Sequence, residues 1–420
     1  MIGHIPTDLL LAHARDLAAA GGPPVPESAR EVTDLAVTGP VEIYAHTRAA
    51  AAQGTGSVLM SSGGTTGRPK LTHVPHGMGL ERLLDFWRPL RPGDVLLNLF
   101  NAGRMWGSHY YMQTLAEKSH CTVIPSGPYS PEEVAGWLEM FEEVGVNALA
   151  GTPTGLADFA QGVLDAGTSI PALPVRTIIW MAEPWTGNKR DLVREAFPDA
   201  GLWGNYGSVE TWVMAANQPG CDETTLHLLP SQIMEPDEDG ALLSRVGDGW
   251  TVPVVRYRLG DRVAPATCRC GRPDALTVLG RADDSLTLRS ALFKVSELID
   301  LVREEPGVVE AQLRLTRSTD SARAASALTL DFTGTAAPEA VRARLTGEFY
   351  HLAAVARQYP DALRARRVSR LARIERTNKV PAMVWQESPA NENPANERTE
   401  HERTEHDEKP HGDRKGENAA

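Results

Sequence analysis

The sequence predicts an α/β protein with two domains, and two observations lead to that prediction. Between residues 95 and 197, short apolar runs of β-type residues alternate with helix-like windows, which is typical of βαβ units and of a largely parallel sheet with flanking helices. After residue 284 the pattern changes to a shorter α+β module, which indicates a second, smaller domain. With 420 residues, 42% of them hydrophobic, the chain is long enough to bury a sizeable core.

The expected elements follow in order along the chain. Leucines 9, 10, 11 and 17 have helical spacing and predict an N-terminal helix that ends before the Gly-Gly-Pro-Pro break at 21–24. In the large domain, strands are expected at 95–100, 121–124 and 175–180, and helices at 131–143 and 188–197. In the small domain, helices are expected at 295–304 and 337–352, and strands at 308–315 and 327–332.

Charge and composition exclude several classes of function. The formal net charge of -12 argues against general binding to nucleic acid or to an anionic membrane. No run of eighteen apolar residues occurs, and residues 1–16 include charged and histidine side chains, so the sequence predicts neither a membrane span nor a secretory signal. We therefore expect a cytoplasmic protein. Its oligomeric state, monomer or homodimer, is left open.

The last 34 residues differ from the rest of the chain. Residues 387–420 contain no Val, Ile, Leu, Met, Phe, Trp, Tyr or Cys and are rich in Glu, Asn, His, Lys and Arg. Such a segment cannot bury enough apolar surface to offset the entropy of ordering. The sequence predicts a disordered acidic tail there.

The most informative segment is 61–70, Ser-Ser-Gly-Gly-Thr-Thr-Gly-Arg-Pro-Lys, which follows a strand-like run at 58–60. Its glycines allow the backbone to approach an anion closely, its hydroxyl groups can donate to phosphate oxygens, and Lys70 adds a positive charge. The segment differs from the P-loop motif because no Ser or Thr follows the lysine directly. It predicts a phosphate-binding loop; taken alone, an ordinary strand-to-helix turn is the alternative.

Three further motifs follow at 205–210 (Asn-Tyr-Gly-Ser-Val-Glu), 257–261 (Tyr-Arg-Leu-Gly-Asp) and 280–284 (Gly-Arg-Ala-Asp-Asp). In this order they resemble the motifs of the adenylate-forming superfamily, which includes acyl-CoA synthetases, peptide-synthetase adenylation domains and luciferases. The short N-terminal part, the Cys-Arg-Cys-Gly-Arg run at 268–272 and the weak C-terminal lysine motif are most similar to phenylacetate-CoA ligase-like enzymes. The resemblance covers about residues 30–386.

The resemblance implies a large domain at 1–282 that binds nucleotide and acid, and a small mobile lid domain at 283–386. It also implies ATP as cofactor, bound by a set of residues from five segments. These are Ser62, Gly63, Thr65, Thr66, Lys70, Ala182, Glu183, Pro184, Tyr206, Gly207, Asp261 and Arg281.

Within that set, the resemblance assigns phosphate contacts to Thr66 and its neighbours, adenine stacking to Tyr206 and the ribose hydroxyls to Asp261. Glu210 would bind Mg²⁺, which prefers hard oxygen ligands. Taken alone, Tyr206 and Glu210 would be a packed aromatic side chain and a solvated acid. The expected catalytic residues are Lys379, Glu210 and Thr66.

Two positions of the small domain complete the expected machinery. Lys379 is the candidate for the lysine that contacts the reacting carboxylate and phosphate, although the usual glycine before it is Asn378, which can also adopt a left-handed backbone. A surface lysine is the alternative. Asp283 is the expected hinge, with a surface turn as the alternative.

The acid pocket is expected along 100–111 and at Gly151, because aromatic and polar side chains are dense after the strand at 95–100. The predicted pocket residues are Phe100, Trp106, His109, Tyr110 and Gly151. Aromatic walls favour an aromatic carboxylic acid as the substrate. For each residue alone, an aromatic packing loop is an equally good interpretation.

Three of the four cysteines group near the expected hinge. Cys221, Cys268 and Cys270, with His227, predict a tetrahedral Cys₃His Zn²⁺ site with a structural role. The alternative is a set of buried free cysteines.

The predicted function is ATP-dependent adenylation of a carboxylic acid to acyl-AMP, followed by transfer to CoA. Ser290 replaces the glycine that the family usually has in the loop near the CoA channel, and this substitution leaves a second function open. In that alternative the acceptor is a carrier protein, an amine or a nitrite-type nitrogen nucleophile. A non-catalytic nucleotide-binding relative is the third possibility.

Overall fold

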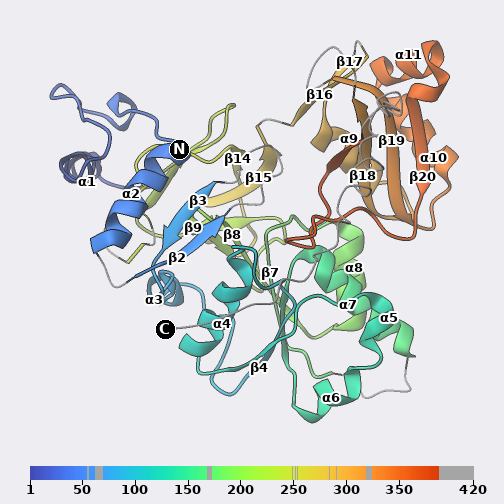
Figure 1. Ribbon diagram of the computed structural model, residues 1–420, viewed down its shortest axis with the longest axis horizontal. Helices are drawn as coiled ribbons and strands as arrows, with labels where there is room; N and C mark the ends of the chain where they lie inside the picture. Colours follow the sequence, from blue (N-terminus) through green and yellow to red (C-terminus); the bar gives the residue numbers. More distant parts are fainter. Residues whose placement is uncertain are drawn as a thin grey trace, which may run out of the picture.

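The computed structural model describes residues 1–53, 56–61, 70–167, 173–247, 249–250, 252, 254–282, 284–289, 291–317 and 324–386. Figure 1 shows two lobes, with the C-terminal strands and helices β16 to β21 and α9 to α11 forming the smaller one beside helices α7 and α8. We call residues up to 282 the large lobe and residues 284–386 the small lobe. The link between the lobes follows strand β15 (Ala275–Arg281).

A nine-stranded sheet runs through the large lobe in the order β14-β15-β10-β9-β8-β7-β6-β4-β5. Five neighbouring strands are parallel: β4 (Val95–Asn98), β5 (Thr122–Pro125), β6 (Ala148–Gly151), β7 (Thr177–Met181) and β8 (Gly201–Ser208). Parallel strands need crossover connections, and the helices supply them. The predicted fold class is therefore confirmed.

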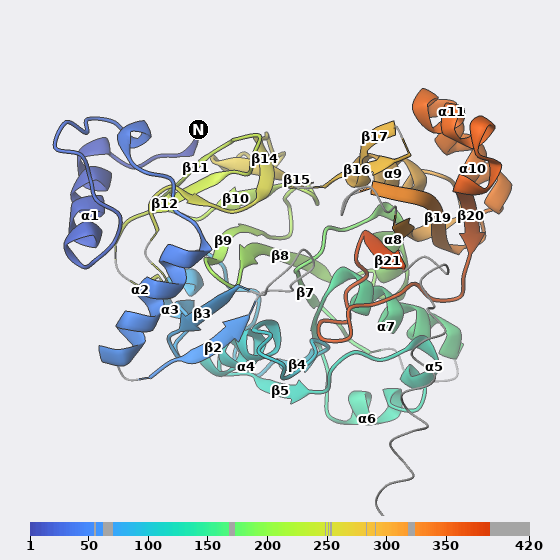
Figure 2. The ribbon, with the colours of Figure 1, turned by 45° about the horizontal axis from the view of Figure 1, so that its top comes forward.

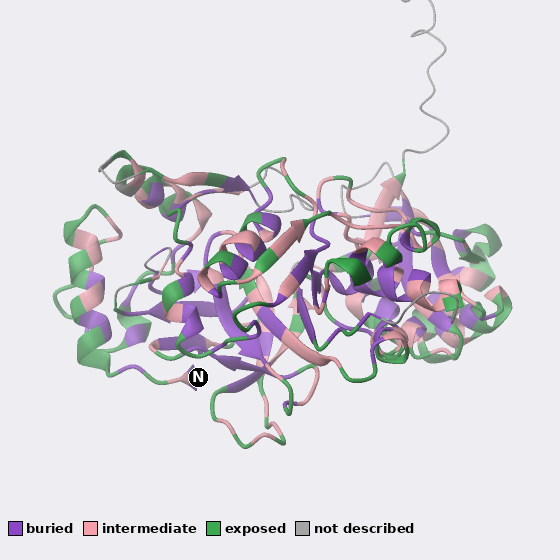
Figure 3. Ribbon diagram, turned by 90° about the horizontal axis from the view of Figure 1, so that it is seen from below, coloured by how far each residue is buried: buried purple, intermediate pink, exposed green. Residues whose placement is uncertain are grey.

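Alternate residues of the parallel strands point to opposite faces of the sheet, and each face has its own core. Leu96 and Ile179 pack with α3 (Leu80–Leu84) and α4 (Ser108–Lys118) on one face. Leu97 and Ile178 pack on the other face with a second group of helices. That group consists of α5 (Pro131–Val134), α6 (Leu138–Glu143), α7 (Pro153–Ala166) and α8 (Gly187–Ala196). Figure 3 shows buried residues concentrated at the centre of the large lobe.

The remaining strands of the large lobe are antiparallel. β9 (Trp212–Asn217), β10 (Leu226–Leu228), β15 and β14 (Asp261–Pro265) extend the nine-stranded sheet beyond β8. A second sheet contains β1 (Ile2–Gly3), β11 (Gln232–Glu235), β12 (Leu242–Arg245) and β13 (Tyr257–Arg258), and β2 (Val58–Ser61) pairs with β3 (Leu71–Val74). The N-terminal helices are α1 (Thr7–Ala19), the 3₁₀ turn η1 (Val32–Asp34) and α2 (Pro40–Gln53).

The small lobe has a six-stranded mixed sheet of its own. Its strands are β16 (Ser285–Leu288), β17 (Ala291–Lys294), β18 (Val308–Arg317), β19 (Ala324–Gly334), β20 (Leu363–Arg367) and β21 (Met383–Gln386). Helices α9 (Val295–Arg303), α10 (Pro338–Glu348) and α11 (Tyr350–Gln358) and the 3₁₀ turn η3 (Pro360–Ala362) complete it. A separate apolar cluster of residues from these elements forms its core.

Two expected helices are each interrupted in the structure. The window 131–143 forms α5 and α6, with Gly136 in the gap, because glycine is a poor helix residue. The window 337–352 forms α10 and α11, since Phe349 between them has an extended backbone with φ -106° and ψ 95°. In both windows the apolar residues continue at helical spacing across the break, so their periodicity alone could not predict it. In the described part of the chain, no helix is both long and apolar enough to cross a membrane.

Candidate active site

The candidate site lies where the parallel strands of the large lobe end. The segments that follow β4, β6, β7 and β8 all lie at this carboxyl edge, which is where open α/β sheets usually bind ligands. The segment 182–184 begins directly after β7, and Ala182 has a left-handed backbone with φ 77°. A non-glycine residue in that conformation is uncommon and often occurs at functional sites.

Tyr206, Asp261 and Arg281 form one hydrogen-bonded group. The Tyr206 hydroxyl donates to Oδ2 of Asp261 at 2.9 Å, and Nη1 of Arg281 donates to Oδ1 of the same carboxylate at 3.1 Å. Burial and then the Asp261 charge raise the pKa of Tyr206 well above its ordinary value, so the phenol stays protonated and donates. The structure thus brings together three residues that the sequence assigned to the nucleotide.

Gly207 follows Tyr206 at a position that no larger residue could occupy without movement. The register of β8 against β9 shifts between Tyr206 and Gly207, and a Cβ atom on Gly207 would lie 2.2 Å from the carbonyl oxygen of Trp212. Glycine therefore permits the close approach of the two strands that sets the direction of Tyr206.

Glu210 is the second acidic group of the site. It is 3% exposed, and its Oε1 atom lies 2.9 Å from Nζ of Lys70. The Tyr257 hydroxyl also donates to this oxygen, at 3.3 Å. A buried carboxylate requires such partners. Lys70 and Glu210, which the sequence assigned to the phosphates and to Mg²⁺, are in contact.

Several expected residues lie outside the described residues. Ser62, Gly63, Thr65 and Thr66 of the phosphate-binding loop belong to this group, as do the hinge Asp283, Ser290 and the tail 387–420. At the base of the loop, β2 and β3 pair in antiparallel register with Ser61 opposite Leu71.

Lys379 of the small lobe lies at the site of the large lobe. Its Nζ atom is 5.6 Å from the centre of the Trp106 ring and lies over the ring face. Asn378 has φ 56°, so it adopts the left-handed backbone that the usual glycine would provide. Burial lowers the pKa of Lys379; the charge of Glu183 opposes this shift and that of Arg376 adds to it.

Further contacts attach the Lys379 loop to the large lobe, and sequence reasoning did not find them. Arg104 pairs with Glu375 at 2.6 Å, and Nη1 of Arg376 donates to the carbonyl oxygens of Ser61 at 3.2 Å and Arg104 at 3.0 Å. The Asn101 amide contributes two longer hydrogen bonds of 3.4 Å to the backbone of Glu375 and Arg376. The proximity of Glu375 and Arg376 to Lys379 in the sequence was the only available signal.

The expected acid-pocket residues lie on the loop after β4, on α4 and at the end of β6. Phe100 and Trp106 are buried and pack edge to face, with ring centres 5.7 Å apart. Nδ1 of His109 donates to the Phe100 carbonyl oxygen at 2.7 Å, which fixes the imidazole. Tyr110 is 38% exposed, whereas Gly151 is buried against the side chains of Leu99 and Leu156. Trp106 therefore links the expected acid pocket to Lys379.

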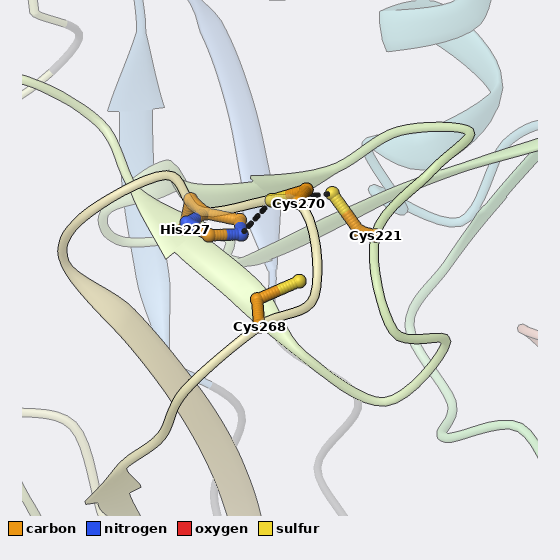
Figure 4. A group of neighbouring side chains, drawn as sticks. All are labelled: Cys221, His227, Cys268 and Cys270. Atoms are coloured by element: carbon orange, nitrogen blue, oxygen red, sulfur yellow. Dashed lines mark hydrogen bonds between the residues drawn. The ribbon is translucent and has the colours of Figure 1, made fainter.

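A second group of polar residues lies away from the carboxyl edge. Figure 4 shows Cys221, His227, Cys268 and Cys270 with their donor atoms directed toward one centre, and these atoms all lie within 4.8 Å of one another. The Cys221 and Cys270 sulfurs are 3.7 Å apart, and the Cys270 sulfur is 3.3 Å from Nε2 of His227. Nδ1 of His227 donates to the Pro273 carbonyl oxygen at 2.8 Å, so Nε2 is the nitrogen that faces the group.

The profile of the AMP-binding enzymes matches residues 13–269, which is more than half of the chain. The chain belongs to the AMP-binding enzyme family. The superfamily predicted from the four motifs is thereby confirmed, and Cys221, His227 and Cys268 lie within the matched range.

Individual relatives are distant. The indoleacetate–lysine synthetase of Pseudomonas savastanoi is 22% identical over 171 residues, which are 40% of this chain and 42% of that protein. The chain thus matches less than half of the length of that relative. The anthranilate CoA ligase AuaEII in complex with anthranoyl-AMP aligns with a TM-score of 0.52 and 15% identity over 77% of this chain and 65% of that one.

The fold also matches 2-hydroxyisobutyryl-CoA ligase over nearly the whole chain. Its postadenylation state with 2-HIB-AMP aligns with a TM-score of 0.62 and 16% identity, over 94% of this chain and 90% of that one. Its thioesterification state with CoA aligns with a TM-score of 0.53 at the same identity, over 94% and 92%. At this identity the likeness concerns the fold.

Proposed function

We propose that this protein is an AMP-forming ligase that activates a carboxylic acid with ATP. In the first step, a carboxylate oxygen attacks the α-phosphorus, the bond from that phosphorus to the bridging oxygen breaks, and pyrophosphate leaves. In the second step, a nucleophile attacks the acyl carbon, AMP leaves, and the nucleophile loses a proton. Two negatively charged reactants must meet in the first step, so the site must supply positive charge.

The position of Lys379 carries this proposal. Its ammonium group lies over Trp106 and is influenced by the charges of Glu183 and Asp261. Lys379 would contact the carboxylate and the phosphate oxygens as charge develops between them. A lysine in this position also disfavours the interpretation as a non-catalytic nucleotide-binding relative.

ATP would be held by the Tyr206, Asp261 and Arg281 group and by the phosphate-binding loop. Tyr206 offers a ring face for adenine, and Asp261 is an acceptor for ribose hydroxyls. Glu210 is a buried carboxylate beside Lys70 and suits Mg²⁺, a hard cation that prefers oxygen ligands. When bound, Mg²⁺ would supply counter-charge to the triphosphate.

For the substrate we propose an aromatic carboxylic acid. The buried edge-to-face pair of Phe100 and Trp106 offers the aromatic wall that such an acid prefers. The name of AuaEII concerns an aromatic acid, whereas that of 2-hydroxyisobutyryl-CoA ligase concerns an aliphatic one. Support for an aromatic substrate therefore comes from the pocket residues of this chain rather than from its neighbours.

CoA is the proposed acceptor, and an amine is the second candidate. Several structural neighbours are named as CoA ligases. The curated relative is named as a synthetase that joins indoleacetate to lysine, and this name favours an amine. A carrier protein remains the third acceptor class from the sequence. Ser290 is the residue that motivates the alternatives to CoA.

We also propose a structural Zn²⁺ ion bound by Cys221, His227, Cys268 and Cys270. Tetrahedral zinc with sulfur ligands at about 2.3 Å separates two sulfurs by about 3.8 Å, and a sulfur and a nitrogen by about 3.6 Å. The observed separations are 3.7 Å and 3.3 Å. Four protein ligands leave no open position, so the ion would not take part in the reaction.

The proposed domain division follows the separate sheets and cores of the two lobes. Residues 1–282 would form the large nucleotide- and acid-binding domain, and residues 283–386 the small lid, with Asp283 as the hinge. Residues 387–420 would form the acidic tail. A cytoplasmic location and the absence of nucleic-acid and membrane partners remain predictions from composition.

The experiment that tests the proposed function is mass spectrometry of acyl-AMP formation across a library of aromatic and aliphatic acids with ATP and Mg²⁺. Each acid is tested without acceptor, with CoA, and with lysine as the amine. We expect acyl-AMP with an aromatic acid in the first arm and a thioester in the second. An amide in the third arm would select the amine acceptor, and no acyl-AMP with any acid would refute ligase activity.

A further inference from the structure

A buried ion pair joins the two lobes at a place where the proposed reaction does not use it. Lys189 on α8 of the large lobe pairs with Glu310 on β18 of the small lobe, and the two side chains are 4% and 5% exposed. Figure 1 shows α8 directly beside β18. Charges are rarely buried this deeply unless each has several partners. The remaining partners of both residues therefore indicate what the pair does.

Glu310 has partners within its own lobe. Its Oε1 atom accepts from Nε of Arg303 at 2.8 Å and from the backbone N–H of Ala311 at 2.9 Å. Burial alone would raise the pKa of Glu310, but Lys189 and Arg303 lower it to about 2, so the carboxylate is charged. Glu310 is thus a fixed negative charge that the small lobe presents to Lys189.

Lys189 has a second partner that leads toward the candidate site. Its Nζ atom donates to the Thr154 hydroxyl at 2.9 Å, and that hydroxyl donates to Oε2 of Glu183 at 2.6 Å. The backbone N–H of Thr154 also donates to Oε2 of Glu183, at 3.0 Å. Because Lys189 can only donate, it orients the Thr154 hydroxyl so that the hydroxyl proton points to Glu183.

Glu183 completes the series at the small lobe. Its other oxygen, Oε1, accepts from the backbone N–H of Val380 at 3.1 Å, and Val380 directly follows Lys379. We call Glu310, Lys189, Thr154 and Glu183 the interlobe chain. It begins with Glu310 on β18 of the small lobe, and its last residue, Glu183 of the large lobe, binds the loop that carries Lys379, so the chain connects two parts of the small lobe through the large lobe. Figure 2 shows that loop crossing over α7 near the start of β21.

We propose that Lys189 and Thr154 are positioning residues for adenylation: through Glu183 they hold the backbone after Lys379, and Glu310 makes this arrangement available only when the lobes are docked. This inference rests on the proposed function, because its effect on the reaction can be measured only if the protein forms acyl-AMP. None of these residues needs to contact the reacting atoms. A small misplacement of a catalytic group is enough to lower a rate by roughly 100-fold.

The test uses the full chain and four variants. Lys189→Met and Glu310→Gln each remove one charge of the buried pair. Thr154→Val removes the hydroxyl while keeping the shape of the side chain, and Thr154→Ser keeps a hydroxyl. The matched control is Arg314→Met in the small lobe. Arg314 pairs at 2.8 Å with Asp331, whose side chain is 1% exposed. After Arg314→Met, the buried Asp331 still has Arg366 as a partner, just as Glu310 still has Arg303 after Lys189→Met.

The first measurement is amide hydrogen exchange of the peptide 373–380, which requires no substrate and is independent of the proposed function. We expect Lys189→Met, Glu310→Gln and Thr154→Val to raise its exchange at least tenfold while β4, β6 and β7 keep wild-type protection. Thr154→Ser and Arg314→Met should leave the peptide protected. Unchanged exchange in Lys189→Met and Thr154→Val, or an equal rise in Arg314→Met, would overturn the inference.

The second measurement is pyrophosphate exchange with an acid identified in the library. The kcat of Lys189→Met and Thr154→Val should fall roughly 100-fold, whereas the KM for ATP stays within about threefold of wild type. Thr154→Ser should recover most of the rate. Loss of peptide protection without any fall in kcat would refute the positioning role, and an inactive wild type would instead refute the proposed function.

Discussion

Replacement of Cys270 by serine should remove the proposed zinc site, because Cys270 lies closest to two of the other ligands. Its sulfur contacts the Cys221 sulfur at 3.7 Å and Nε2 of His227 at 3.3 Å. We expect about one Zn²⁺ per chain in the wild type and less than a tenth of that in Cys270→Ser. Inductively coupled plasma mass spectrometry after dialysis against metal-free buffer measures both.

The size of the stability effect follows from the linkage between binding and folding. An ion that binds only the folded state, at a free concentration 1,000 times its Kd, stabilises that state by about 4 kcal/mol. One kcal/mol shifts the Tm of a medium-sized domain by about 2 °C or more. Cys270→Ser or a chelator should therefore lower the Tm of the large lobe by roughly 8 °C.

Cys121 provides the matched control. It lies outside the proposed zinc site, and its thiol donates to the Arg91 carbonyl oxygen at 3.0 Å. Cys121→Ser should keep both the zinc content and the sensitivity to chelator. Wild-type protein without stoichiometric zinc, or equal zinc content in Cys270→Ser and wild type, would refute the site.

Four further predictions concern the reaction and the tail. Lys379→Ala should lower the rate of pyrophosphate exchange by about 10²–10³-fold without weakening ATP binding measured by calorimetry, and full activity would exclude the lysine. Because the pKa of Lys379 is lowered from 10.5, its charge is present below that lowered pKa and lost above it. The rate of pyrophosphate exchange should therefore decline with rising pH already below pH 10.5, and Lys379→Arg should move this decline to higher pH. If the decline stays at the same pH in Lys379→Arg, another group causes it. Tyr206→Phe removes the hydrogen bond to Asp261 and should raise the KM for ATP about tenfold, and an unchanged KM would contradict that contact. Truncation after Gln386 should leave the rate of acyl-AMP formation unchanged, and a large loss would show that the tail contributes.

The sequence predicted best those strands whose residue pattern is typical of a single kind of secondary structure. The strands at 95–100 and 175–180 form β4 and β7 because short, continuous apolar runs suit a sheet that is buried on both faces. The short antiparallel strands β10 and β13 were not predicted, since they are only three and two residues long. Strands of that length carry no measurable alternation.

The site shows a similar contrast. Tyr206, Asp261 and Arg281 were predicted from motifs, and the structure brings them into contact. Lys189 and Glu310 could not be predicted as partners, because a lysine on a helix and a glutamate on a strand are ordinarily solvated surface residues. Their burial depends on the docking of two lobes whose residues lie far apart in the sequence.

Strand β15 connects two centres that have been described separately. At its first residue, Ala275 pairs with His227 of the proposed zinc site, and at its last, Arg281 pairs with Asp261 of the proposed nucleotide site. Seven extended residues span about 20 Å and cannot shorten. If zinc fixes one end of this strand, occupancy of the metal site and affinity for ATP are linked, and the linkage must be reciprocal. Bound nucleotide should then slow the loss of zinc to a chelator that traps the ion only after it dissociates. If zinc rebinds at the same rate with and without nucleotide, the factor by which its loss slows equals the factor by which zinc tightens the binding of nucleotide.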